Sequence, residues 1–84
     1  MASKSDKVAS ERARLKRAMI AVAKASREDK DLSRQVLAER LGLTYRQVVN
    51  MEHGRRAISF EDFVLLAKAI GVEPSELLKR VLSW

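Results

Sequence analysis

One short segment of the chain combines a phenol, a guanidinium and two amides: Tyr45, Arg46, Gln47 and Asn50. A guanidinium can donate two hydrogen bonds to guanine, and an amide can pair in the same way with adenine. Val48 and Met51 fall three residues apart on one face of a helix, which leaves the four polar side chains pointing outward. We therefore expect this segment to contact the edges of DNA bases.

Each of these side chains has an alternative role. Arg46 could contact a phosphate instead of a base, and Asn50 faces the same way one turn later. Tyr45 could pack on the helix surface or contact DNA through its hydroxyl or ring. Gln47 lies three residues after Thr44, which is the spacing of a capping box, so its amide also has a structural use.

Two short helices joined by a turn must position these residues. Ser33 stands at an N-cap position, Leu37 and Leu41 share an apolar stripe, and Gly42 can adopt the left-handed conformation that ends a helix. Thr44 then precedes the second helix. The pattern predicts a helix-turn-helix over residues 33–52, which is a way to present a helix to the major groove of DNA.

Three further helices are predicted around this unit. A long helix covers residues 6–27 after a disordered start at 1–5, and its stripe is Val8, Leu15, Met19 and Val22. A fourth helix begins after the N-cap Ser59 and ends at Gly71, with these residues packing inward: Phe60, Phe63, Leu66, Ala67 and Ile70. A fifth helix covers residues 74–82, with Pro74 at its first position. We expect an all-α, five-helix domain over residues 6–84.

Positive charge is concentrated in the first two thirds of the chain, which has 84 residues and a net charge of +6. Residues 1–32 carry nine basic and five acidic side chains (+4), residues 33–58 carry five and two (+3), and residues 59–84 carry three and four (−1). This distribution suits a polyanionic partner on the long first helix and the helix-turn-helix.

The composition argues against several other classes of protein. Cysteine is absent, and His53 is the only histidine, with Glu52 alone beside it, so we expect no metal, no cofactor and no enzyme activity. No apolar run approaches the roughly 20 residues of a membrane span, and the polar N-terminus does not resemble a signal peptide. We expect a cytoplasmic protein with no evident small-molecule ligand.

Residues 33–59 closely resemble the helix-turn-helix of the lambda-repressor/Cro-like (Xre) family, and a weaker match continues to Leu78. Three segments carry the resemblance in the same order: LAERLG, EHGRR and AKAIGV. The resemblance implies a lambda-repressor-like DNA-binding domain. It also implies that Arg55 and Arg56 contact the DNA backbone, as does Arg34, which replaces a glutamine usual in the family.

Other backbone contacts are expected at the ends of the two short helices. The hydroxyl and backbone N–H of Ser33 could bond a phosphate, Thr44 occupies the corresponding position of the next helix, and His53 could offer a backbone donor. The full set of expected backbone contacts is Ser33, Arg34, Thr44, His53, Arg55 and Arg56.

Apolar residues near the C-terminus predict self-association. Val64 and Leu65 are expected to form an exposed patch with the fifth helix, and helix-turn-helix proteins of this size usually bind two half-sites as dimers. The expected dimer interface comprises Val64, Leu65, Leu78, Val81, Leu82 and Trp84. The alternative is that these residues complete the core of a monomer.

These observations favour a homodimeric transcriptional regulator, by default a repressor, that binds double-stranded DNA at a palindromic operator. Similar dimensions are typical of an antitoxin that also autoregulates its operon, with a toxin as its protein partner, and of a restriction-modification controller. A protein-interaction module without DNA binding is a further alternative, which the presence of Arg46, Arg55 and Arg56 disfavours.

Overall fold

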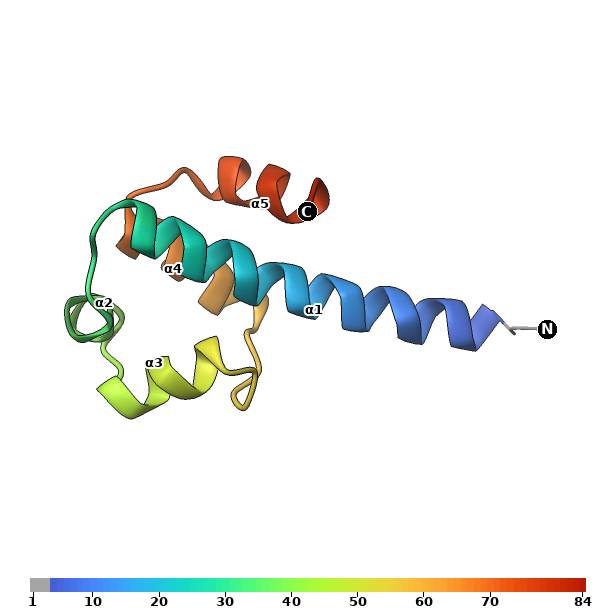
Figure 1. Cartoon of the computed structure of the whole chain (residues 1–84), viewed down its shortest axis with the longest axis horizontal. Coiled ribbons are helices and arrows are strands. Elements are labelled where there is room, and N and C mark those ends of the chain that lie inside the picture. The colour runs from blue at the N-terminus through green and yellow to red at the C-terminus, as the bar shows by residue number, and fades with distance from the viewer. Residues whose placement is uncertain (1–3) are drawn as a thin grey trace.

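The computed structural model describes residues 4–84, which form five helices. The helices are α1 (Lys4–Asp29), α2 (Arg34–Leu41), α3 (Tyr45–Glu52), α4 (Phe60–Ile70) and α5 (Pro74–Leu82). Helix α1 lies between α5 on one side and α3 on the other, and α4 packs against α1, α2 and α5 (Figure 1). The expected all-α, five-helix architecture with a long first helix is confirmed.

Local sequence signals set the ends of α2 and α4. The Ser33 side chain accepts a hydrogen bond from the backbone N–H of Val36 at 3.1 Å, and the Ser59 side chain caps α4 in the same way. Gly42 ends α2 with a φ of 67°, and Gly71 ends α4 with a φ of 91°. Glycine adopts this left-handed conformation without the steric cost of a Cβ atom, so both predicted ends are confirmed.

Helix α1 is longer than predicted at both ends. It begins at Lys4 rather than Asp6, so Lys4 and Ser5 belong to a helix and not to the disordered start that we predicted; residues 1–3 lie outside the described residues. It continues two residues past Arg27 to Asp29. The chain then turns at Asp31, whose φ of 53° is a left-handed conformation that aspartate tolerates better than most residues.

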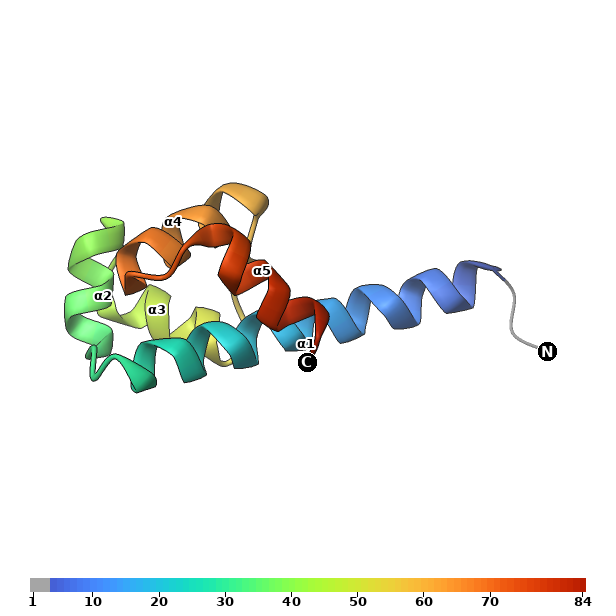
Figure 2. The ribbon, with the colours of Figure 1, turned by 90° about the horizontal axis from the view of Figure 1, so that it is seen from above.

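The N-terminal half of α1 projects beyond the other helices (Figure 2). Residues 6–13 are all exposed, because no other described helix reaches them. Val8, the first residue of the predicted apolar stripe, is 52% exposed, whereas Leu15 and Met19 pack against the core and Val22 is buried. The stripe therefore packs against the domain only from Leu15 onward.

The core is formed where α1, α2, α3, α4 and α5 meet. Its most completely buried large side chains come from three helices: Leu37 of α2, Val48 of α3, and Leu77 and Val81 of α5. Phe63, Leu66, Ala67 and Ile70 of α4 are also buried, as predicted.

Phe60 departs from the prediction that it packs inward. Its side chain is 77% exposed. It occupies the first position of α4, at the rim of an apolar groove bounded by α1, α4 and α5, where none of the other described helices covers it.

Leu77 and Leu78 provide a direct test of how α5 packs. We expect Leu77→Ala to lower the free energy of unfolding by about 2 to 5 kcal/mol, because the side chain is fully buried and its removal leaves a cavity. Leu78→Ala, at a site that is 47% exposed, should have a clearly smaller effect. Urea unfolding would check both, and equal losses of stability would contradict the placement of α5.

Candidate nucleic-acid interface

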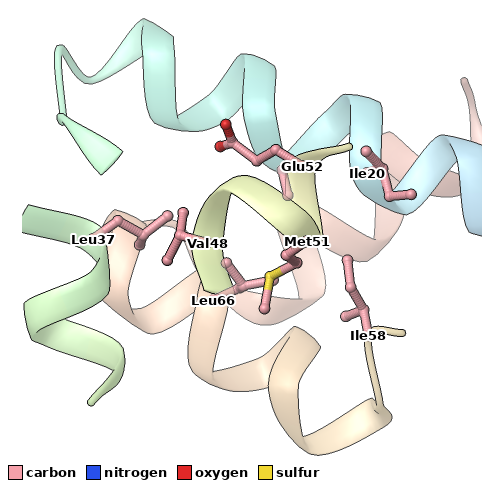
Figure 3. A pocket seen from close by; sticks show the side chains of 8 residues that line it. Ile20, Leu37, Val48, Met51, Glu52, Ile58 and Leu66 are labelled. Carbon is pink, nitrogen blue, oxygen red and sulfur yellow. The ribbon is translucent and has the colours of Figure 1, made fainter. Parts of the chain in front are cut away.

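The two faces of α3 differ as the sequence predicts. Val48 and Met51 are buried, and Figure 3 shows their side chains lying among residues of α2 and α4. They leave a cavity of only about 10 Å³ around them. On the other face Tyr45 is 50% exposed and Arg46 is exposed. Packing of Val48 and Met51 thus fixes the direction in which the polar side chains of α3 point.

Gln47 and Asn50 are half-buried and have structural roles as well. The Gln47 Oε1 atom accepts a hydrogen bond from the Thr44 N–H at 2.9 Å, while the Thr44 hydroxyl accepts one from the Gln47 N–H at 3.1 Å. The predicted capping box is therefore present. The amide nitrogen of Gln47 and the hydroxyl proton of Thr44 remain able to donate hydrogen bonds.

The loop after α3 folds back on the helix end. The Asn50 carbonyl accepts hydrogen bonds from the N–H groups of Arg55 at 2.8 Å and Arg56 at 3.3 Å. Arg55 is exposed, whereas Arg56 is half-buried and its Nε is fully buried without a hydrogen-bond partner. Only the terminal nitrogens of Arg56 could therefore reach a phosphate. His53, at the C-cap of α3, is exposed.

A buried carboxylate joins the first three helices. The Glu52 side chain is 7% exposed and accepts hydrogen bonds from the Nε atoms of Arg27 and Arg34, both at 2.7 Å. Arg27 also donates to the Leu32 carbonyl at 2.8 Å, which holds the chain between α1 and α2. Figure 3 shows the Glu52 carboxylate pointing from α3 toward α1. This cluster fixes the end of α3 relative to both other helices.

The electrostatics of the cluster favour the ionised carboxylate. Burial by itself raises the pKa of Glu52, but the hydrogen bonds and charges of Arg27 and Arg34 outweigh it, so this pKa lies below its ordinary value. The pKa of Arg34 is raised by its hydrogen bond with Glu52 and, secondarily, with Tyr45. The resemblance assigns Arg34 to the DNA backbone, but the Nε–H group of Arg34 already donates a hydrogen bond to Glu52 inside the protein.

Sequence reasoning missed the roles of Arg27 and Glu52. Arg27 was expected only to end the first helix, and Glu52 was considered only as a metal ligand. One signal was available, because Glu52 follows Val48 by four residues and therefore shares the buried face of α3.

Four of the six residues expected at the dimer interface, Val64, Leu78, Val81 and Leu82, line one apolar groove, whereas Leu65 and Trp84 lie outside it. Leu65, Leu78, Leu82 and Trp84 are exposed and Val64 is half-buried, but Val81 is 2% exposed and belongs to the core. Val81 is therefore a core residue that only lines the floor of the groove, because α5 turns this side toward α1 and α4.

The groove measures about 520 Å³ and its walls include Leu15, Met19, Phe60, Val64, Leu78 and Leu82. Trp84 lies outside it, beside α1.

Residues 4–84 contain neither a membrane-spanning helix nor a cluster of metal ligands. None of the helices there combines the length and apolar character needed to cross a membrane. In the same residues, no group of three or more histidine, cysteine, aspartate or glutamate side chains is arranged to hold a metal ion.

Comparisons with a family model and with solved structures both match the chain to helix-turn-helix proteins. The helix-turn-helix family model matches residues 24–77. The fold is similar to an XRE-family like protein from Pseudomonas syringae pv. tomato str. DC3000, with a TM-score of 0.81 and 25% identity over 96% of each chain. It is also similar to the clp gene regulator ClgR of C. glutamicum, with a TM-score of 0.75 and 25% identity over 82% of this chain and 90% of that one. No curated protein sequence matches the chain.

Glu52→Gln should destabilise the domain by about 3 to 5 kcal/mol, because the neutral amide leaves the buried Arg27 without a counter-charge. The folded-state pKa of Glu52 is depressed, so its stabilising effect is present above the unfolded pKa of about 4.3 and is lost as pH falls through the folded value.

Unfolding measured by circular dichroism between neutral pH and about pH 2 would test this prediction. The wild type should lose more stability than Glu52→Gln below about pH 4.3. Glu39→Gln, at an exposed position on α2, is the matched control. Parallel acid dependence in wild type and Glu52→Gln would contradict the role of the cluster.

Proposed function

Because this chain belongs to the Xre-type helix-turn-helix family of DNA-binding proteins, we propose that it is a transcriptional repressor that binds a palindromic operator as a homodimer. The observation that carries this proposal is the geometry of α3. Its buried face and the Glu52 cluster hold the helix in place, while Arg46 and its polar neighbours point outward. The structural neighbour ClgR is a clp gene regulator, and this likeness supports a regulatory role.

In this proposal α3 enters the major groove and its first turns read the bases. Arg46 grips a guanine through both arms of its guanidinium, and Asn50 pairs with an adenine. Tyr45 contacts a thymine methyl or a phosphate, and Gln47 donates from its free amide nitrogen. Ser33, Arg34, Thr44, His53, Arg55 and Arg56 contact the backbone and set the register of the helix.

The proposed dimer forms through the apolar groove between α1, α4 and α5. Phe60 is 77% exposed at its rim, and Leu78 and Leu82 are also exposed, which is unusual for three large apolar side chains in so small a domain. In a two-fold symmetric dimer the Phe60 ring of each copy would pack into the groove of the other. The contact is self-complementary, because each chain carries one exposed ring and one groove. Exposed Leu65 lies on the same helix as Phe60, and Trp84 is also exposed, beside α1.

A dimer of this kind represses by occupying promoter DNA. Two copies of α3 would contact half-sites about one helical turn apart, which makes a palindrome the natural target. The bound dimer would then block access of the polymerase to the promoter.

Arg46→Ala should weaken binding to a selected operator by about 1 to 3 kcal/mol and relax the preference at one base pair. Arg46→Lys keeps the charge but loses the planar fork, so it should also relax that preference. Fluorescence anisotropy with the operator and with single-base variants would measure both. If Arg46→Ala weakened every sequence equally and Arg46→Lys restored binding, Arg46 would be a phosphate contact instead.

Leu78→Asp and Leu82→Asp should each convert the dimer to a monomer, because either change places a charge in the groove. Val8→Asp is the matched control, since Val8 is also exposed but lies on the projecting half of α1. Sedimentation equilibrium would give the masses. A dimer that survives both groove substitutions would place the interface elsewhere, and a monomeric wild type would exclude the homodimer and leave a different protein as the occupant of the groove.

A further inference from the structure

Helix α1 has a basic side, and none of the DNA contacts proposed above involves it. Lys16 and Arg17 stand where α1 leaves the domain, next to the end of α3. They line a hollow of about 470 Å³ together with Ile20, His53 and Gly54. The two elements are close here, because a Cβ atom on Gly54 would lie 3.5 Å from the Ile20 Cδ1 atom. The loop that carries Arg55 therefore runs directly beside α1.

Lys16 and Arg17 take part in none of the ion pairs formed among residues 4–84. Arg14 pairs with Glu11, Arg27 and Arg34 pair with Glu52, and Arg80 pairs with Glu76. No carboxylate among the described residues pairs with Lys16 or Arg17, and both side chains are exposed. Arg12 stands one turn before Lys16 on the same face and is likewise exposed and unpaired in this part of the chain.

The N-terminal half of α1 contributes little to the packing of the domain. Residues 6–13 are exposed on every side, so the helix buries little apolar surface before Leu15. From Leu15 onward the apolar side of α1 faces the groove, whereas Lys16 and Arg17 face the loop after α3. The exposed side of the helix that carries Lys16 and Arg17 thus extends the positive surface of Arg55 without adding to the core.

We propose that Lys16 and Arg17 bind phosphates of the same DNA duplex that α3 enters, so that α1 forms a second backbone-contacting element. The inference rests on the proposed DNA binding. Continuity with the loop after α3 and the lack of internal counter-charges identify the ligand as DNA backbone phosphate. Contacts of this kind carry no sequence information, but they release counterions and strengthen binding to every sequence. Arg12 would lengthen the contact by one helical turn.

The test is the salt dependence of binding to a mixed-sequence DNA duplex. Lys16→Ala/Arg17→Ala should lower the magnitude of the slope of log K against log salt by about 0.9 for each phosphate that is no longer bound, or about 1.8 in all. Alanine favours helix, so the variant should keep α1, which circular dichroism would verify. The control, Lys68→Ala/Lys79→Ala, removes the same charge from exposed sites on α4 and α5 and should leave the slope close to that of the wild type.

Adding a positive charge to α1 should change the salt slope in the opposite direction. Ala13 is exposed and stands one turn before Arg17, so Ala13→Lys should steepen the slope. If the wild type bound the duplex and neither variant differed from the control, α1 would not contact DNA, while the proposed function would stand. If the wild type bound no duplex at any salt concentration, the proposed function itself would be wrong, and this inference with it.

Discussion

The arrangement of the helices depends on one buried carboxylate. Glu52 accepts hydrogen bonds from Arg27 and Arg34, so a single side chain joins the end of α3 to α1 and to the start of α2. A buried charge is tolerated only when it is paired and hydrogen-bonded, so the three helices must keep this geometry together. The apolar side chains of α3 hold the helix against the core, and the cluster fixes its end. The outward direction of Arg46 follows from both.

Local signals made most of the fold predictable. Ser33, Thr44 and Ser59 each cap a helix as their positions indicate, and Gly42 ends one in the left-handed conformation. These features depend on residues three or four apart, so the sequence contains all the information needed. The same holds for the polarity of α3, because the spacing of its apolar residues decides which side is buried. The contacts of its polar side with DNA remain a prediction.

Features that depend on distant neighbours were not predictable. Phe60 fits the apolar spacing of α4, yet its side chain is left exposed by the residues that the structure describes, because α1 and α5 leave a groove at that point. Val81 was expected at a dimer interface but is in the core, since α5 turns that side toward α1 and α4. The pairing of Arg27 with Glu52 joins residues far apart in the sequence, and charge patterns along one helix do not reveal such a pair.

The central claim is that the exposed side of α3 recognises base sequence, and selection from a random pool of DNA duplexes by the purified chain tests it most directly. We expect enrichment of an inverted repeat whose half-site centres lie about 10 to 10.5 base pairs apart, with conserved guanine and adenine positions in each half. A pool that binds but shows no enriched sequence after repeated rounds would contradict base recognition by α3.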